Sequence, residues 1–207
     1  MKYPRQAAEL IDLLAQDQAQ WKEYAKAEFI DKLSDEKLQA LKHDLRKSVA
    51  WRGRRALQIL GEIKDQPSLD AIGSEAATAL SVLATHDSLE ATKRVLAAFE
   101  ACYRLSTENT QAASIPAMVD WIAVLEHRPQ TFGTIWLFDD NDFPFLPVVE
   151  DFANINTRRE RYSIGPLKWP KSMAIPEEDQ LWLKQPIEDA IMRAPTKAEL
   201  QKLSEFY

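Results

Sequence analysis

Six polar side chains of this 207-residue sequence have the types and spacing that ligand binding or proton transfer would need. They are His86, Arg128, Gln130, Thr134, Arg158 and Arg159. An imidazole titrates near neutral pH and can carry a proton. Guanidinium groups hold anions through paired hydrogen bonds, while amides and hydroxyls fix orientation. The set predicts a polar site for a small anionic or peptide-like ligand, with His86 as its candidate catalytic residue.

His86 stands at the end of a helix predicted over residues 69–85. The apolar stripe of that helix comprises Leu69, Ile72, Ala76, Leu80 and Leu83. At about 100° per residue, His86 lies roughly 80° from the centre of the stripe, at the rim of the core. It either bonds the last carbonyls of its helix or faces a pocket as an acid or base. The periodicity favours the first interpretation and leaves the second open.

The segment after residue 127 changes to β-branched and aromatic residues, TFGTIWLF at 131–138. On an extended strand, Arg128, Gln130 and Thr134 fall on one side together with Phe132. Gly133 would permit a bulge or a close approach of ligand to the backbone. These polar side chains could bind a carboxyl group, or they could form hydrogen bonds with unpaired backbone groups at helix ends in the core. The basic cluster at 158–161 could likewise bind an anion or form salt bridges with acidic neighbours.

Common catalytic signatures are absent. The sequence has no GxGxxG, phosphate loop, GxSxG, HExxH or CxxC motif. His43, His86 and His127 lack metal-ligand spacing, so neither a metal site nor a cofactor is expected. Cys102 is the single cysteine, which excludes an internal disulfide. Its place on an apolar helix face is typical of inert packing.

A basic run between residues 42 and 55 is a candidate interaction surface. It holds Lys42, Arg46, Lys47, Arg52, Arg54 and Arg55, with Trp51 among them. It could bind phosphate or nucleic acid. The net charge of −6 disfavours nucleic acid and favours a solvated helix face.

The sequence predicts a mainly α protein. Helices are expected over residues 5–28, from Ser34 through the basic run, over 69–85, over 88–104, from Ser114, and over about 154–162. Gly53 is a weak point of the second helix. Asp87 and Glu90 form a predicted capping box at the start of the helix over 88–104. Whether the second helix continues through Gly53 or a third begins there stays open.

A single small β-hairpin is expected over about 131–149. Its turn is the polar tetrad at 139–142, and Pro144 and Pro147 confine its second strand to an edge. We expect a single-domain helical bundle over 1–207. It comprises a helical core over 5–127, a hairpin and Pro-rich segment over 128–176, and C-terminal helices over 177–205.

The composition, 45% hydrophobic and 28% charged, is that of a soluble globular protein. Asp12 and Asp17 interrupt the apolar residues of the N-terminus, so no signal peptide is expected. No apolar run approaches bilayer length, so no membrane association is expected. A cytoplasmic location is the prediction.

Short motifs scattered over roughly residues 8–170 resemble an uncharacterised, mostly bacterial domain-of-unknown-function family, number six-six-two-four. The matching residues are Asp17-Gln18, Gly73-Ser74-Glu75-Ala76-Ala77, His86-Asp87, the run from Arg128 to Thr134, the run from Pro147 to Asp151, Arg158-Arg159 and Gly165. The resemblance implies a pocket, because His86, Gln130, Thr134 and Arg159 coincide with the family's polar motif positions. It implies no particular reaction.

Four positions depart from the family's pattern. His127 replaces a glycine, Phe132 a tyrosine, Ile135 a glutamine and Asn156 an aspartate. An Asp-to-Asn change removes a general base while keeping its shape. Chemistry that uses that glutamine or aspartate is therefore not expected here.

Two functions follow. The first is a ligand-binding pocket, with catalysis left open. The second is a non-enzymatic acidic interaction protein of the immunity, antitoxin or scaffold type. Its motives are the net negative charge, the acidic tetrad of Asp139, Asp140, Asn141 and Asp142, and six tryptophans, a residue common at interface hot spots.

Overall fold

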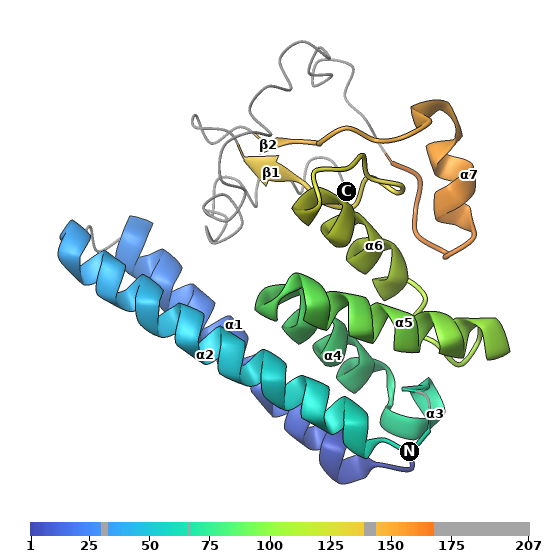
Figure 1. Cartoon of the computed structure of the whole chain (residues 1–207), viewed down its shortest axis with the longest axis horizontal. Coiled ribbons are helices and arrows are strands. Elements are labelled where there is room, and N and C mark those ends of the chain that lie inside the picture. The colour runs from blue at the N-terminus through green and yellow to red at the C-terminus, as the bar shows by residue number, and fades with distance from the viewer. Residues whose placement is uncertain (30–32, 66, 139–143, 168–207) are drawn as a thin grey trace. The chain divides into compact units, whose positions relative to one another are not determined.

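The fold of the chain is mostly helical, as Figure 1 shows for a computed structural model. The structure describes residues 1–29, 33–65, 67–138 and 144–167. The mainly α prediction is confirmed. The chain divides into two compact units, Met1–Met118 and Val119–Tyr207. The single-domain assignment stays a prediction, and the helices predicted over 177–205 and the turn tetrad lie outside the described residues.

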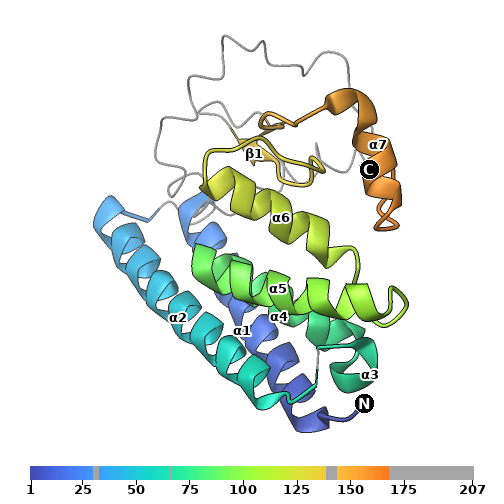
Figure 2. The ribbon, with the colours of Figure 1, turned by 45° about the vertical axis from the view of Figure 1, so that its right-hand side comes forward.

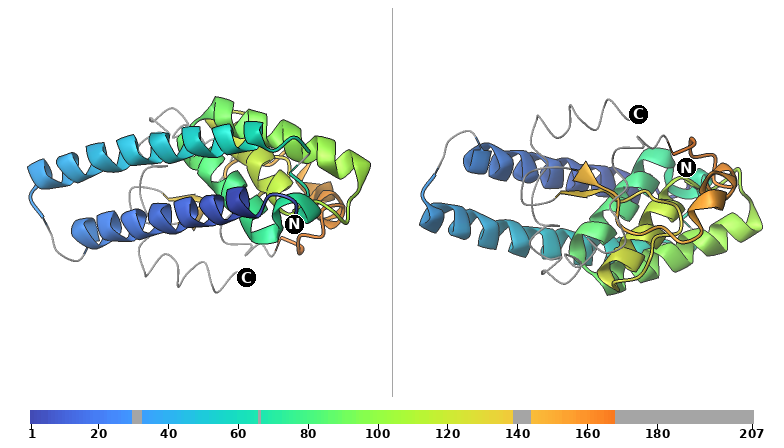
Figure 3. Two further views of the ribbon diagram at one scale, coloured as in Figure 1. Left: turned by 90° about the horizontal axis from the view of Figure 1, so that it is seen from below. Right: turned by 90° about the horizontal axis from the view of Figure 1, so that it is seen from above.

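The first unit is built on two long helices, α1 (Pro4–Phe29) and α2 (Asp35–Glu62). They lie side by side, and the ends joined by residues 30–34 extend past α4 and α5 of the same unit (Figure 3). Ser34 is the N-cap of α2, as predicted. The helix continues through Gly53, so the alternative of a third helix starting there is wrong.

Gly53 lies inside α2 at a position where Asp87 of α4 occupies the space that a side chain would need. A Cβ on Gly53 would lie 2.1 Å from the Cβ of Asp87, the last residue of α4. Only a residue without a Cβ lets the Asp87 side chain come this close to the α2 backbone. The glycine that looked like a weak point in the sequence is thus a packing contact between α2 and α4.

The helix predicted over 69–85 is two helices, α3 (Leu69–Ile72) and α4 (Ser74–Asp87). Gly73 separates them with φ of 82° and ψ of 163°, a conformation that glycine adopts readily. Its N–H donates to the carbonyl of Leu69 and ends the first turn. The residues on both sides of Gly73 are helical, as the apolar periodicity predicted.

Helix α5 (Leu89–Leu105) begins one residue later than the predicted capping box implies. Its N-cap is Ser88, whose hydroxyl accepts from the N–H of Ala91 at 3.2 Å. Asp87 still belongs to α4 and was wrongly predicted as the cap. Helix α4 packs against α1, α2 and α5 (Figure 2), and its buried alanines let these helices approach closely.

Helix α6 (Ser114–Leu125) contains the boundary between the units. The second unit continues with the strands β1 (Leu137–Phe138) and β2 (Pro144–Phe145), a 3-10 turn over Phe152–Asn154, and α7 (Ile155–Glu160). The two strands are antiparallel, with Leu137 opposite Phe145 and Phe138 opposite Pro144.

This ladder is much shorter than the hairpin predicted over 131–149. Residues 131–136 form a loop, because Asp120 and the side chain of Gln130 bind backbone groups there that a strand would pair. Gly133 turns the chain with φ of 61°. Among the described residues, no helix is both long and apolar enough to cross a membrane.

Candidate functional site

The first polar cluster centres on Asp17 of α1, whose side chain is fully buried. Arg52 of α2 is 4% exposed, and its Nε and Nη2 atoms both lie 3.0 Å from Asp17 Oδ1. Each residue lies on the buried face of its own helix, so packing the two helices brings the charges together. A buried charge is tolerated when an opposite charge and hydrogen bonds compensate it.

His86, from the last turn of α4, binds the other oxygen of the same carboxylate. Its Nδ1 lies 2.7 Å from Asp17 Oδ2. A carboxylate only accepts hydrogen bonds, so a neutral His86 must carry its proton on Nδ1, with Nε2 as an acceptor. The side chain is 27% exposed, and no described residue forms a hydrogen bond with Nε2. Nδ1 therefore binds Asp17 and not the last carbonyls of α4, and the acid or base role of His86 stays a prediction.

Two residues of α1 complete the surroundings of this pair. Gln20 Oε1 accepts from Arg52 Nη2 at 2.9 Å, and its amide donates to Ser48 Oγ at 3.2 Å. The ring of Trp21 meets the ring of His86 edge-on, with centroids 5.9 Å apart and planes at 65°. The guanidinium and the imidazole are therefore both held in place by contacts within the first unit.

Asp87 fixes the end of α4 on which His86 stands. Its side chain packs on Gly53 of α2. Burial raises the pKa of Asp87 above its ordinary value, and the nearby charge of Arg54 partly opposes this effect. The contact anchors the helix end that presents the imidazole.

The second polar cluster lies in the second unit around Asp120 of α6, which is also fully buried. From described residues it accepts four hydrogen bonds. The N–H groups of Thr131, Phe132 and Thr134 donate at 2.8, 2.9 and 2.8 Å, and the Thr134 hydroxyl donates at 2.8 Å. Burial raises the pKa of Asp120, although these donors act in the opposite direction. These hydrogen bonds let the carboxylate fix the backbone conformation of the loop that follows α6.

Gln130, fully buried, closes the same loop with its side chain. Its Oε1 accepts from the N–H of Ile135, and its Nε2 donates to the carbonyl of Ile135, both at 2.9 Å. Its backbone pairs with Val148 and Glu150. Every polar group of Gln130 contributes to the loop, which is a structural role.

The predicted basic residues of α7 bind the carbonyls of that loop. Arg159, 8% exposed, donates from Nη1 to Phe132 O at 2.7 Å and from Nε to Gly165 O at 2.6 Å. Arg158 donates from Nε to Thr131 O at 2.8 Å and forms an ion pair with Asp151 at 3.3 Å. The salt-bridge interpretation of this cluster is thus correct for Arg158.

Gln130, Thr134, Arg158 and Arg159 therefore meet around residues 131–134. The side chain of Arg128 is 56% exposed and instead pairs with Glu126 at 2.6 Å. His86 belongs to the first unit, where its partner is Asp17. The convergence of His86 with the residues of the second unit stays a prediction.

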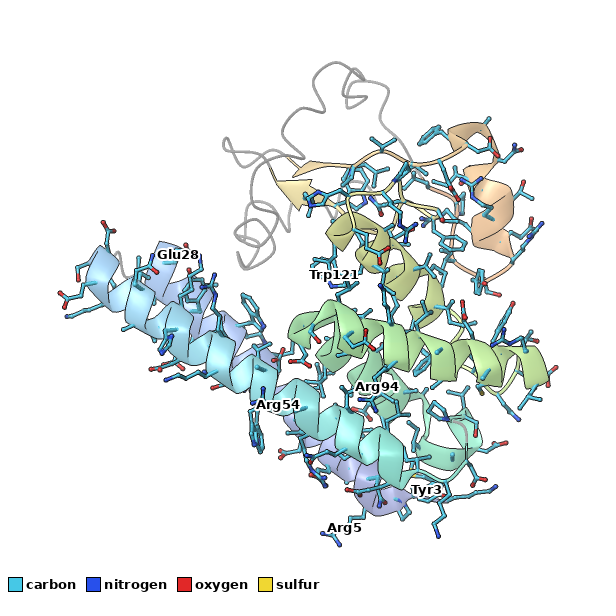
Figure 4. The ribbon with its side chains drawn as sticks, in the orientation of Figure 1. Tyr3, Arg5, Glu28, Arg54, Arg94 and Trp121 are labelled. Carbon is cyan, nitrogen blue, oxygen red and sulfur yellow. The ribbon has the colours of Figure 1, made fainter. Side chains whose placement is uncertain are left out.

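The sequence interpretation missed two residues that organise these clusters. Arg52 was assigned to a solvated face but is buried. Its spacing of three and four residues from Val49 and Ala56, both apolar and buried, was the available signal. Asp120 was the lone carboxylate inside an apolar helix, which was the signal for a buried anion. Other residues of the basic run match their interpretation, such as the exposed Arg54 on α2 (Figure 4).

Within the described ranges, no group of three or more His, Cys, Asp or Glu side chains is placed to hold a metal ion. Comparison of the chain with protein-family models, with curated proteins and with solved structures gives no match.

Proposed function

We propose that this chain is a ligand-binding protein. The imidazole of His86 binds the ligand and transfers a proton, and Asp17 orients the imidazole for this role. The observation that carries the proposal is the 2.7 Å contact of His86 Nδ1 with a fully buried carboxylate, while the ring stays partly exposed. An imidazole oriented in this way by a carboxylate is the arrangement that general bases use.

The charges of the cluster suit proton uptake. Asp17 and Arg52 together carry no net charge, so a neutral His86 leaves the cluster neutral. Nε2 then accepts a hydrogen bond from a hydroxyl or N–H group of a ligand and takes its proton. The resulting cation stands in the last turn of α4, where the helix dipole stabilises positive charge. It then donates to an oxygen of an anionic or peptide-like ligand.

The resemblance to the domain-of-unknown-function family remains a proposal. Several residues of its motifs contact each other: Asp17 binds His86 across 69 residues, while Arg158 with Asp151 and Arg159 with the carbonyl of Gly165 are local pairs. We place the ligand at His86 because the guanidinium groups of α7 already bind loop carbonyls.

A ligand screen with matched histidine variants tests the proposal. Small carboxylates, phosphates and short peptides are added to the isotope-labelled chain, and changes in the amide and imidazole NMR signals are recorded. We expect binding that is lost in His86→Gln and kept in His43→Gln, because His43 is exposed on α2. The imidazole ¹⁵N shifts of the free protein should report the Nδ1–H tautomer. An Nε2–H tautomer, or equal binding by both variants, would remove the proposal.

The exposed side chains on one face of α2 favour a second candidate function, that of a non-enzymatic protein that binds a partner protein. Lys47, Trp51 and Arg54 follow each other at spacings of four and three residues, and Trp51 is 54% exposed. Among the described residues, neither cation has an ion pair within 4.0 Å. An aromatic side chain between two cations suits an acidic protein segment with an apolar side chain.

The test is a salt-dependent complex. A partner captured from cell extract is purified and bound again to the wild-type chain and to Lys47→Glu/Arg54→Glu. Loss of at least tenfold in affinity, with no loss for Glu23→Lys on α1, supports the second candidate. An unchanged affinity rejects it.

A further inference from the structure

Four residues of α1 form one continuous row beside His86. Asp17, Trp21, Tyr24 and Glu28 follow each other at steps of four, three and four, which places them on one face of a helix. The Trp21 ring meets the His86 ring, and it meets the Tyr24 ring edge-on with centroids 6.4 Å apart. Tyr24 donates from its hydroxyl to Glu28 Oε1 at 3.3 Å. The row ends at Glu28, near the C-terminal end of α1 (Figure 4).

Two polar atoms of this row are buried and lack a partner within the described part of the chain. Trp21 Nε1 and Glu28 Oε2 are shielded from solvent, and no described residue forms a hydrogen bond with either atom. One is a donor and the other is a carboxylate acceptor. Leaving such atoms buried and unpaired costs roughly 1–3 kcal/mol for each neutral group and more for a charged one. A bound group that satisfies both would remove this cost.

We propose that the ligand of the His86 site is a short peptide-like molecule with a protonated amine. The amine donates to Glu28 Oε2 beside the Tyr24 ring, and an oxygen of the ligand accepts from Trp21 Nε1. This inference rests on the proposed function for the role of His86. An amine fits because it supplies both the donor and the positive charge that the carboxylate lacks, and aromatic faces attract cations.

The spacing of the two unpaired atoms sets the size of the ligand. Seven residues separate Trp21 from Glu28, which is about 10.5 Å along a helix axis. Their side chains tilt in the same direction along the helix, so the separation of their ends stays similar. An extended peptide spans about 3.3–3.6 Å per residue, so about three residues reach from one atom to the other. A single amino acid, with its amine and carboxylate on one carbon, is too short.

The experiment is calorimetric titration of the full chain with three probes: trialanine, N-acetyl-trialanine and alanine. We expect trialanine to bind, and both the acetylated peptide and alanine to bind at least tenfold more weakly. Glu28→Gln should weaken trialanine binding at least tenfold, while Glu23→Gln, an exposed glutamate of the same helix, leaves it unchanged. Trp21→Phe keeps the ring, removes the N–H donor and should weaken binding as well.

The outcomes separate this inference from the proposed function. No binding of trialanine, or equal binding of its acetylated form, overturns the amine inference. Binding of a carboxylate or phosphate that depends on His86 but not on Glu28 also overturns it and keeps the proposed function. Trialanine binding that depends on Glu28 but not on His86 keeps the amine site and rejects the role of His86. Thermal unfolding of each variant serves as a folding control, and Glu28→Gln should unfold no earlier than wild type, since it removes an incompletely paired charge.

Discussion

His86 Nδ1 and Asp17 Oδ2 lie 2.7 Å apart although 69 residues separate them along the chain. The contact joins the last turn of α4 to the middle of α1, and Arg52 of α2 binds the same carboxylate. One buried anion therefore connects three helices of the first unit and orients the imidazole that we assign to ligand binding.

Replacing the buried carboxylate should destabilise the first unit strongly. Asp17→Asn leaves Arg52 buried without its counter-charge, and we expect a loss of about 3–5 kcal/mol in the free energy of unfolding. Urea unfolding monitored by circular dichroism measures this loss. Asp12→Asn is the control, because Asp12 is exposed and its carboxylate accepts from the Gln16 amide of its own helix. Equal stability of the two variants would contradict the structural role of the cluster.

Two glycines of α2 should respond to alanine in opposite directions. Gly53→Ala places a methyl group against Asp87, and we expect a loss of about 1–3 kcal/mol from overpacking. Gly61→Ala finds nothing within 4 Å and should gain up to about 1 kcal/mol from helix propensity. Thermal melts of both variants measure the difference. A Gly53→Ala variant as stable as Gly61→Ala would show that α2 and α4 are not in close contact.

Removing the anion that organises the loop of the second unit should loosen that loop. Asp120→Asn replaces an acceptor oxygen by an NH₂ group that faces N–H donors, so we expect a loss of about 1–3 kcal/mol. Hydrogen exchange at the amides of Thr131, Phe132 and Thr134 should become faster. Glu160→Gln, at an exposed site of the same unit, should leave their exchange unchanged. Unchanged exchange in Asp120→Asn would show that Asp120 does not fix the conformation of this loop.

The ion pairs of Arg55 should make the first unit sensitive to acid. Hydrogen bonds from Arg55 hold the pKa values of Glu9 and Glu62 below their ordinary value of 4.5. A carboxyl whose folded pKa is depressed stabilises the fold above its unfolded pKa, and this contribution is lost as the pH falls through the folded pKa. We therefore expect stability to fall as the pH drops below about 4.5, by less in Arg55→Met than in wild type. Urea midpoints at pH 7, 5, 4 and 3 measure this, and parallel curves for the two proteins would contradict it.

Much of the helical part of the fold could be predicted, because burial on one helix face repeats every three to four residues. The predicted helix over 5–28 is α1 (Pro4–Phe29), and the helix expected from Ser34 is α2, with Ser34 at its N-cap position. The errors occurred where one residue decides the local structure. Gly73 adopts a positive φ that periodicity does not report, and the hydroxyl of Ser88 caps α5 where a carboxylate at 87 was expected.

The site was harder to predict because its contacts are tertiary. In the sequence, Asp17 interrupts the apolar residues of the first helix, but its partners lie 35 and 69 residues away. The β-branched residues after 130 have strand propensity, yet a carboxylate ten or more residues upstream takes their N–H groups. Propensity is a local property, and a buried anion can override it.

The buried pair of Asp17 and Arg52 has a consequence for how α1 and α2 align. Apolar stripes on two helices of 26 and 28 residues could pack in several alignments, each displaced by about one turn of 5.4 Å. Any such displacement would separate the two charges and leave both buried and unpaired. The ion pair therefore selects one register of the helical hairpin, as single buried polar residues do in coiled coils. The hairpin gains a unique alignment from the same residues that present His86.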